Sequence, residues 1–156
     1  MNFVESIKTV VFVKYATFEG RASRSEYWWY MLFIFLMQIL GAVIFSFSSY
    51  HPYGYQEYNP IEIFLSLILF LPSLSVSVRR LHDTNKSGWW LLFPYAIGAI
   101  FGALAYILSK IGLDNSSIFV VIISIGIMNL YLLYLMLKVS DDGENQYGHN
   151  SCLIPK

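Results

Sequence analysis

Four long apolar runs follow one another along the chain, separated by short polar segments. They cover residues 27–48, 60–78, 89–108 and 118–137. Each run is close to the ~20 residues that a helix needs to cross about 30 Å of hydrocarbon. Lipid offers no hydrogen-bond partner to an open backbone, and the runs lack the alternation of barrel strands. The pattern therefore predicts an all-α membrane protein, a bundle of four transmembrane helices.

The polar ends of the chain complete a single membrane domain that covers residues 1–156. Residues 1–26 precede the first run, and Phe3, Ile7 and Val10 recur there at helical spacing. This spacing predicts a short N-terminal amphipathic helix, either on the inner leaflet or packed against the bundle. A signal peptide has a shorter apolar core, so the first run is read as an uncleaved helix.

The composition agrees with lipid as the main solvent of the chain. Hydrophobic residues make up 56% of the chain and charged residues 13%, about half the charged fraction of a typical soluble domain. The formal net charge is zero, so the bulk charge does not suggest a nucleic-acid partner. Cys152 is the only cysteine, and no spacing typical of metal ligands occurs. No metal or cofactor is expected.

The basic residues predict which way the helices run. Of the ten Lys and Arg residues, Lys110 alone falls between the third and fourth runs, and the other nine lie on the opposite side. The loop 49–59 contains neither Lys nor Arg. Because basic loops stay in the cytoplasm, both termini and the segment between the second and third runs are expected to be cytoplasmic, whereas the loop 49–59 is outside. The tail, residues 138–156, is then also cytoplasmic.

Two motifs fall on this cytoplasmic side. They are residues 18–28, FEGRASRSEYW, and residues 79–90, RRLHDTNKSGWW. Charges at the membrane interface are costly alone and stabilised in pairs, so the motifs are expected to meet in a charge cluster. Within it, Glu26 is expected to pair with an arginine of the second motif. The expected cluster contains Arg21, Arg24, Glu26, Trp28, Arg79, Arg80, His82, Asp83, Gly88 and Trp89.

A third motif, residues 143–148, GENQYG, follows the last helix. In this order the three motifs resemble those of the bacterial YhaH-type inner-membrane family, which is domain of unknown function 805 (DUF805). The resemblance spans nearly the whole chain. It implies a small polytopic protein of the bacterial inner membrane, without an established activity.

Few polar groups occur inside the membrane. Gln38 and Asn129 lie at similar distances from the cytoplasmic ends of their helices, roughly 16 and 12 Å. They are expected to form an interhelical hydrogen-bonded pair or, alternatively, to contact a substrate. Pro72 frees the carbonyl of Ile68, which nearby serines could re-satisfy. Gly98 and Gly102 form a GxxxG motif that permits close packing within the bundle or between copies, so a homo-oligomer stays open.

These features favour a non-enzymatic protein without catalytic residues. Its cytoplasmic cluster is expected either to hold the two pairs of helices together or to bind a partner protein or anionic lipid headgroups. One alternative is a small transporter or channel component, which the shortage of intramembrane charge disfavours. A further alternative is a lipid-headgroup enzyme with His82 as its base, which lacks an adjacent nucleophile.

Overall fold

The structure is a computed structural model that describes residues 1–48, 60–110, 117–141 and 143–149. The loop 49–59 and Cys152 lie outside these residues. The described part is helical, apart from one isolated bridge between Asn145 and Gly148. Its elements are α1 (Phe3–Ile7), the π-helix η1 (Lys8–Val13), α2 (Arg24–Ser48), α3 (Pro60–Asp83), the 3₁₀-helix η2 (Gly88–Leu92), α4 (Phe93–Lys110) and α5 (Ser117–Leu137).

Three helical stretches are long and apolar enough to cross a membrane. They are Arg24–Ile44, Ile63–Asp83 and Gly88–Lys110. The apolar stretch Val121–Leu137 is shorter. Many large apolar side chains of these helices face outward, as expected of surfaces that contact lipid rather than water.

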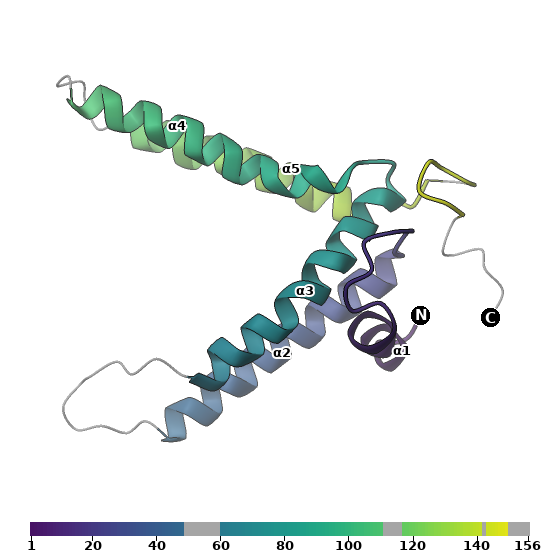
Figure 1. Cartoon of the computed structure of the whole chain (residues 1–156). Helices are drawn as coiled ribbons and strands as arrows, with labels where there is room; N and C mark the ends of the chain where they lie inside the picture. The colour runs from purple at the N-terminus through teal and green to yellow at the C-terminus, as the bar shows by residue number, and fades with distance from the viewer. Residues whose placement is uncertain (49–59, 111–116, 142, 150–156) are drawn as a thin grey trace.

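The four long helices form two antiparallel hairpins, α2 with α3 and α4 with α5 (Figure 1). In the first hairpin, the hydroxyl of Tyr30 donates to the carbonyl of Leu69 at 3.3 Å. In the second, Gly98 lies so close to α5 that an added Cβ would be 3.0 Å from Cδ1 of Ile125. A small residue at this point allows the two helices to approach closely.

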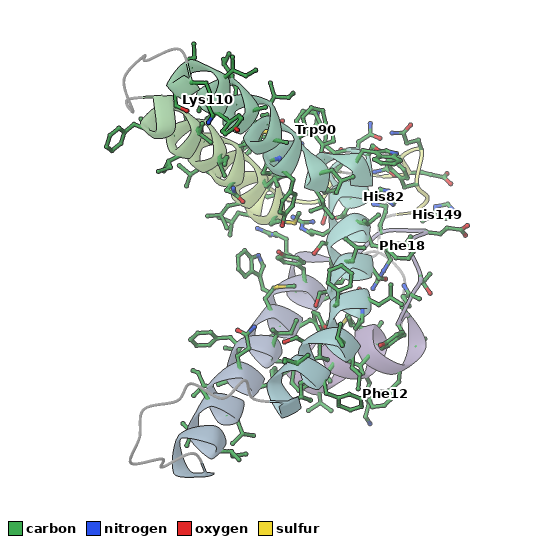
Figure 2. All side chains as sticks on the ribbon, turned by 60° about the vertical axis from the view of Figure 1, so that its left-hand side comes forward. Phe12, Phe18, His82, Trp90, Lys110 and His149 are labelled. Carbon is green, nitrogen blue, oxygen red and sulfur yellow. The ribbon has the colours of Figure 1, made fainter. Side chains whose placement is uncertain are left out.

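The two hairpins diverge from a shared end, so they do not close into the compact bundle expected from the sequence (Figure 1). The apolar contact between them involves Leu81 of α3 with Leu135 and Met136 of α5. Lys110 lies at the opposite end of the second hairpin from Trp90 and His82 (Figure 2). We call the shared end the junction: the start of α2, the end of α3, the end of α5 and residues 138–149.

Helix α3 ends in a well-formed C-terminal cap. Asn85 has a positive φ of 56°, a conformation that asparagine tolerates better than most residues. Its amide donates to the carbonyl of His82 at 3.0 Å, and the amide of Lys86 donates to that of Leu81 at 2.9 Å. These are the two bonds of a Schellman motif, which turns the chain sharply toward η2.

Pro72 does not interrupt α3, because the carbonyl that it frees is satisfied from another segment. The hydroxyl of Tyr15 donates to the carbonyl of Ile68 at 2.6 Å. The serines that were expected to do this bond elsewhere. Ser73 donates to the carbonyl of Leu69 at 2.5 Å, and Ser75 to that of Thr17 at 2.6 Å. The long-range bond from Tyr15 therefore also fastens the N-terminal segment to α3.

The N-terminal helix packs against the first hairpin, which is the second of the two arrangements expected. The hydroxyl of Ser6 donates to the carbonyl of Glu26 at 2.5 Å, and Val10 belongs to an apolar core with Tyr30 and Val76. Phe12 on the other side of η1 points away from the protein (Figure 2) and is 78% exposed. The segment thus has one packed and one open face.

Candidate functional site

The junction brings together all three sequence motifs. The first motif leads into α2, the second ends α3, and the third follows α5, and the amide of Ala22 donates to the carbonyl of Arg79 at 3.0 Å. The amide of Asp141 similarly donates to the carbonyl of Asp83 at 3.1 Å. Backbone hydrogen bonds therefore join the segments in addition to the side-chain contacts.

Asp83 is the centre of the junction. Its carboxylate accepts a bond from Nε of Arg21 at 2.9 Å, and it also pairs with Nη1 of Arg80 and accepts from the hydroxyl of Ser140. The side chains of Asp83 and both arginines are fully buried. Two guanidinium groups and one carboxylate leave a local excess of positive charge, so the remaining arginine donors need further acceptors.

Backbone carbonyls supply those acceptors for Arg21. Its Nη1 donates to the carbonyl of Gly143 at 2.7 Å, and its Nη2 to that of Asp141 at 2.6 Å. A weaker bond of 3.3 Å reaches Gly148. One arginine from before α2 thus holds the turn formed by the third motif. The positive φ of Gly143 and Gly148, 74° and 113°, lets this turn point its carbonyls inward.

Arg80 connects α3 to the end of α5 in the same way. Its Nε donates to the carbonyl of Met136 at 3.1 Å, and its Nη2 donates to that of Lys138. The last carbonyls of a helix have no partner within the helix. Arg80 therefore caps α5 from the neighbouring hairpin.

The structure contains the ion pair expected between Glu26 and the second motif. Nη1 of Arg79 lies 2.5 Å from Oε1 of Glu26, and the side chains are 0% and 4% exposed. Nε and Nη2 of Arg79 are buried without a hydrogen-bond partner in the part of the chain described. The pair is monodentate, so the two-pronged geometry that arginine offers is unused here.

His82 takes part in the junction but does not pair with Asp83. Its imidazole stacks on the ring of Tyr147, with centroids 3.7 Å apart and planes 2° from parallel. Its Nδ1 lies 3.2 Å from the carbonyl of Gly20, and Asn145 donates to the backbone carbonyl of His82 at 2.9 Å. The imidazole therefore supports the third motif, whereas the carboxylate of Asp83 serves the two arginines.

Arg24 is the motif arginine that the junction does not bury. It is exposed and is the first residue of α2. It lies at a groove of about 530 Å³ between the start of α2 and the end of α5. Trp28 and Ser140 also line this groove. Arg24 was expected within the cluster, but the structure places it on the rim.

The second motif also positions its Gly and Trp residues for different tasks. A Cβ on Gly88 would lie 2.8 Å from Cγ1 of Val78, so any other residue here would force Val78 or the chain to shift. Trp89 is 72% exposed, whereas Trp90 packs on Phe93 with ring centroids 4.8 Å apart. Trp89 is thus available to lipid, and Trp90 supports the start of α4.

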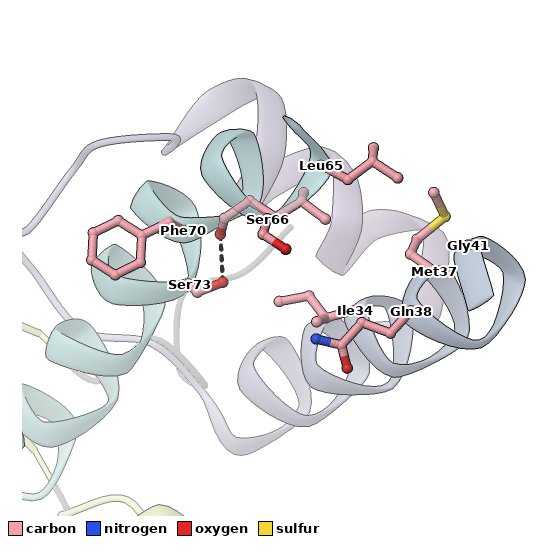
Figure 3. Close-up of a pocket in the computed structure, with 9 residues that line it drawn as sticks. Ile34, Met37, Gln38, Gly41, Leu65, Ser66, Phe70 and Ser73 are labelled. Carbon is pink, nitrogen blue, oxygen red and sulfur yellow. Dashed lines mark hydrogen bonds between the residues drawn. The ribbon is translucent and has the colours of Figure 1, made fainter. Parts of the chain in front are cut away.

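The structure does not bring Gln38 and Asn129 together. Gln38 lines a pocket between α2 and α3 (Figure 3). Asn129 lines a different groove, between the hairpins, and its amide donates to the carbonyl of Ile125 one turn earlier at 2.9 Å. The divergence of the hairpins separates the two helices on which these residues lie (Figure 1).

The sequence did not indicate several residues that connect distant segments: Ser6, Tyr15, Ser140 and Tyr147. Tyr15, Ser140 and Tyr147 bond or stack across more than 50 residues of sequence. Ser6 contacts Glu26, 20 residues away. Single polar residues in apolar or loop segments give no local signal for such contacts. The position of Tyr147 within the third motif was the one available sign. Among the described residues, no group of three or more His, Cys, Asp or Glu side chains could hold a metal ion.

A polytopic helical membrane protein whose cluster of buried arginines ties two hairpins together is the class that these observations define. The chain belongs to the family described as Protein of unknown function (DUF805), whose model matches residues 15–149. It is an integral, multi-pass protein of the inner membrane.

Two curated relatives come from Escherichia coli (strain K12). Inner membrane protein YhaI is 37% identical over 93 residues, which cover 53% of this chain and 64% of the relative. Inner membrane protein YhaH is 35% identical over 89 residues, covering 53% of this chain and 66% of the relative. The chain thus spans slightly less than two thirds of the length of each. No solved structure matches the chain.

Proposed function

We propose that this protein crosses the inner membrane four times, with both termini in the cytoplasm, and binds anionic lipid headgroups without catalysing a reaction. The proposal rests on how the structure divides the motif arginines. Arg21, Arg79 and Arg80 are buried and bonded within the protein. They act as a structural clamp, which leaves Arg24 as the motif arginine that a ligand can reach.

The groove beside Arg24 suits a phosphate-bearing headgroup. It lies at the start of the long helix α2, where the positive end of the helix dipole favours an anion. The aromatic ring of Trp28 lines the same groove and is 37% exposed. Tryptophan favours the membrane interface, at the depth of the headgroups. A cation, a helix terminus and an interfacial ring therefore converge on one groove.

The N-terminal segment supports the same placement. Phe12 and Val13 are 78% and 72% exposed on η1, while Lys8 is exposed on the same short element. Apolar side chains that enter the leaflet beside a lysine at headgroup level are typical of an interfacial helix. This arrangement supports a junction that lies at the cytoplasmic surface of the membrane.

The geometry favours the binding role over catalysis. In the enzymatic alternative, the carboxylate of Asp83 would orient His82 as a base. The imidazole of His82 is stacked against Tyr147, and the carboxylate of Asp83 is bonded to Arg21 and Arg80. The structure therefore contains no His82–Asp83 dyad, which supports a binding role for the junction and its groove.

Native mass spectrometry of the full chain tests the proposal. The protein is released from bilayers with equal amounts of phosphatidylglycerol and phosphatidylcholine, and the retained lipids are counted. We expect preferential retention of phosphatidylglycerol. Arg24→Gln should lower this preference about fivefold, because one interfacial cation contributes about 1 kcal/mol. Arg24→Lys should keep most of it.

Lys110→Gln is the matched control. Lys110 is also exposed at a helix end, but it lies at the far end of the second hairpin (Figure 2). Its substitution should leave lipid preference unchanged. Equal retention of both lipids by the unmodified protein would refute headgroup binding. Equal losses in the Lys110 and Arg24 variants would refute the groove as the site.

A further inference from the structure

A pocket of about 220 Å³ lies within the first hairpin (Figure 3), between the membrane-length stretches Arg24–Ile44 and Ile63–Asp83. Its walls come from α2 and α3 and are mostly apolar, with Ile34, Leu65 and Phe70 among them. The polar groups that line it belong to Gln38, Ser66 and Ser73. An apolar cavity of ~150 Å³ can bind a benzene ring, so this pocket has room for a ring-sized group.

The amide of Gln38 has no hydrogen bond to any of the residues that the structure describes, and it lines this pocket (Figure 3). The residue lies 11 positions past Tyr27, roughly 16 Å along the helix axis. At this depth neither water nor headgroups are at hand, and a polar group without a partner is costly. A hydrocarbon chain could fill the pocket but could not bond to the amide.

The hydrogen bonds of the other polar groups in the pocket indicate which kind of ligand atom the pocket can bind. Ser73 donates its proton to the carbonyl of Leu69 at 2.5 Å (Figure 3). The hydroxyl of Tyr30 also lies within 3.3 Å of that carbonyl and of Ser73. The amide of Gln38 offers two N–H donors and a carbonyl acceptor, and an acceptor atom on a ligand would complement the donors. The lining contains no charged side chain, which excludes an ionised ligand on energetic grounds.

We infer that this pocket binds a neutral, membrane-soluble molecule that presents a carbonyl oxygen to Gln38. The pocket is smaller than a typical site for a whole drug-sized ligand. It therefore holds the carbonyl-bearing head, while an apolar tail remains among the lipid chains beside Phe70, which is 63% exposed. This site is separate from the groove at Arg24 and does not depend on headgroup binding.

Equilibrium binding of two matched probes tests the inference. The full chain is placed in phosphatidylcholine nanodiscs, and labelled decyl-cyclohexanone or decyl-cyclohexane is titrated, with empty nanodiscs subtracted. The ketone should bind saturably, and the hydrocarbon should not. Gln38→Leu removes the donor while keeping the shape, and should weaken ketone binding about fivefold.

Two glycine substitutions separate filling of the pocket from damage to the fold. Gly41 lines the pocket, and an added Cβ would meet nothing within 4 Å. Gly126 in α5 is equally open but does not line this pocket. Gly41→Leu should abolish saturable ketone binding, whereas Gly126→Leu and Arg24→Gln should leave it unchanged.

Three results would overturn the inference. One is that the ketone binds no better than the hydrocarbon. Another is that Gln38→Leu and Gly41→Leu bind the ketone as the unmodified chain does. The third is that the chain is a dimer in nanodiscs and Gln38→Leu makes it monomeric. The amide of Gln38 would then bond to a second copy of the chain and not to a ligand.

Discussion

The carboxylate of Asp83 joins three segments of the junction, because two arginines and a serine share it. Arg21 comes from before α2, Arg80 from α3 itself and Ser140 from after α5. Removing one member of a buried charged network leaves the others without compensation, which is far more costly than the loss of one exposed ion pair. The junction should therefore depend on the charge of Asp83 and not merely on its shape.

Asp83→Asn is expected to lower the free energy of unfolding by about 3–5 kcal/mol, because it leaves two guanidinium groups buried without a counter-charge. Unfolding in micelles, followed by tryptophan fluorescence, measures the loss. Glu144→Gln is the matched control: it makes the same chemical change on an acid whose side chain is 63% exposed. Its effect should stay within about 0.5 kcal/mol. Similar losses in the two variants would contradict the role given to Asp83.

At the residue scale, the sequence predicted one ion pair and missed the contacts of Ser140 and Tyr147 and every backbone acceptor of the arginines. Glu26 and the second motif were expected to pair, and Arg79 does lie 2.5 Å from Glu26. The carbonyls of Met136, Asp141 and Gly143 that receive the arginines could not be foreseen. Every residue has a carbonyl, so a carbonyl acceptor leaves no mark in the sequence.

At the scale of elements, η2 can lie close to α3 because residue 88 is a glycine. The second motif turns back after Asn85, and Gly88 then passes Val78. Because a Cβ at Gly88 would lie 2.8 Å from Cγ1 of Val78, either α3 or the entry to α4 must shift when the side chain grows.

Gly88→Ala is expected to destabilise the protein by about 1–3 kcal/mol through this overlap. Adding Val78→Ala should recover part of the loss, since it removes the atoms that the new methyl group meets. Gly102→Ala, in the open part of α4, should be neutral or slightly stabilising because alanine favours helices. The same unfolding assay compares all variants. No recovery in the double variant would show that the overlap is not the cause.

Hydropathy located the helices but not all of their ends. Helix α3 continues to Asp83, beyond the apolar run that ends at residue 78. Charged residues end an apolar run, yet Arg79 and Arg80 stay helical because the junction supplies partners for them. The third run begins as the 3₁₀-helix η2 and becomes α-helical at Phe93. Pro94 follows at once, and proline is tolerated in the first turn of a helix.

At the scale of the whole molecule, the junction joins the two hairpins, and their far ends lie apart (Figure 1). Polar bonds and the apolar contact of Leu81 with Leu135 and Met136 hold the shared end. The sequence could not predict this divergence, because hydropathy fixes the depth of a helix and not its tilt or its neighbours. The bundle expected from the sequence and the open arrangement observed differ in one testable distance, that between α2 and α5 at mid-membrane.

Cysteine cross-linking in native membranes measures that distance. On a Cys152→Ser background, the pair Gly98→Cys and Ile125→Cys should form a disulfide on mild oxidation, because the two residues touch within the second hairpin. The pair Gln38→Cys and Asn129→Cys should not, because the hairpins diverge between them (Figure 1). Mass spectrometry identifies the linked peptides, and mixing isotopically light and heavy chains separates links within a chain from links between copies. An intramolecular link between positions 38 and 129 would mean that the hairpins close in the bilayer, since disulfide formation needs Cα atoms within about 7 Å.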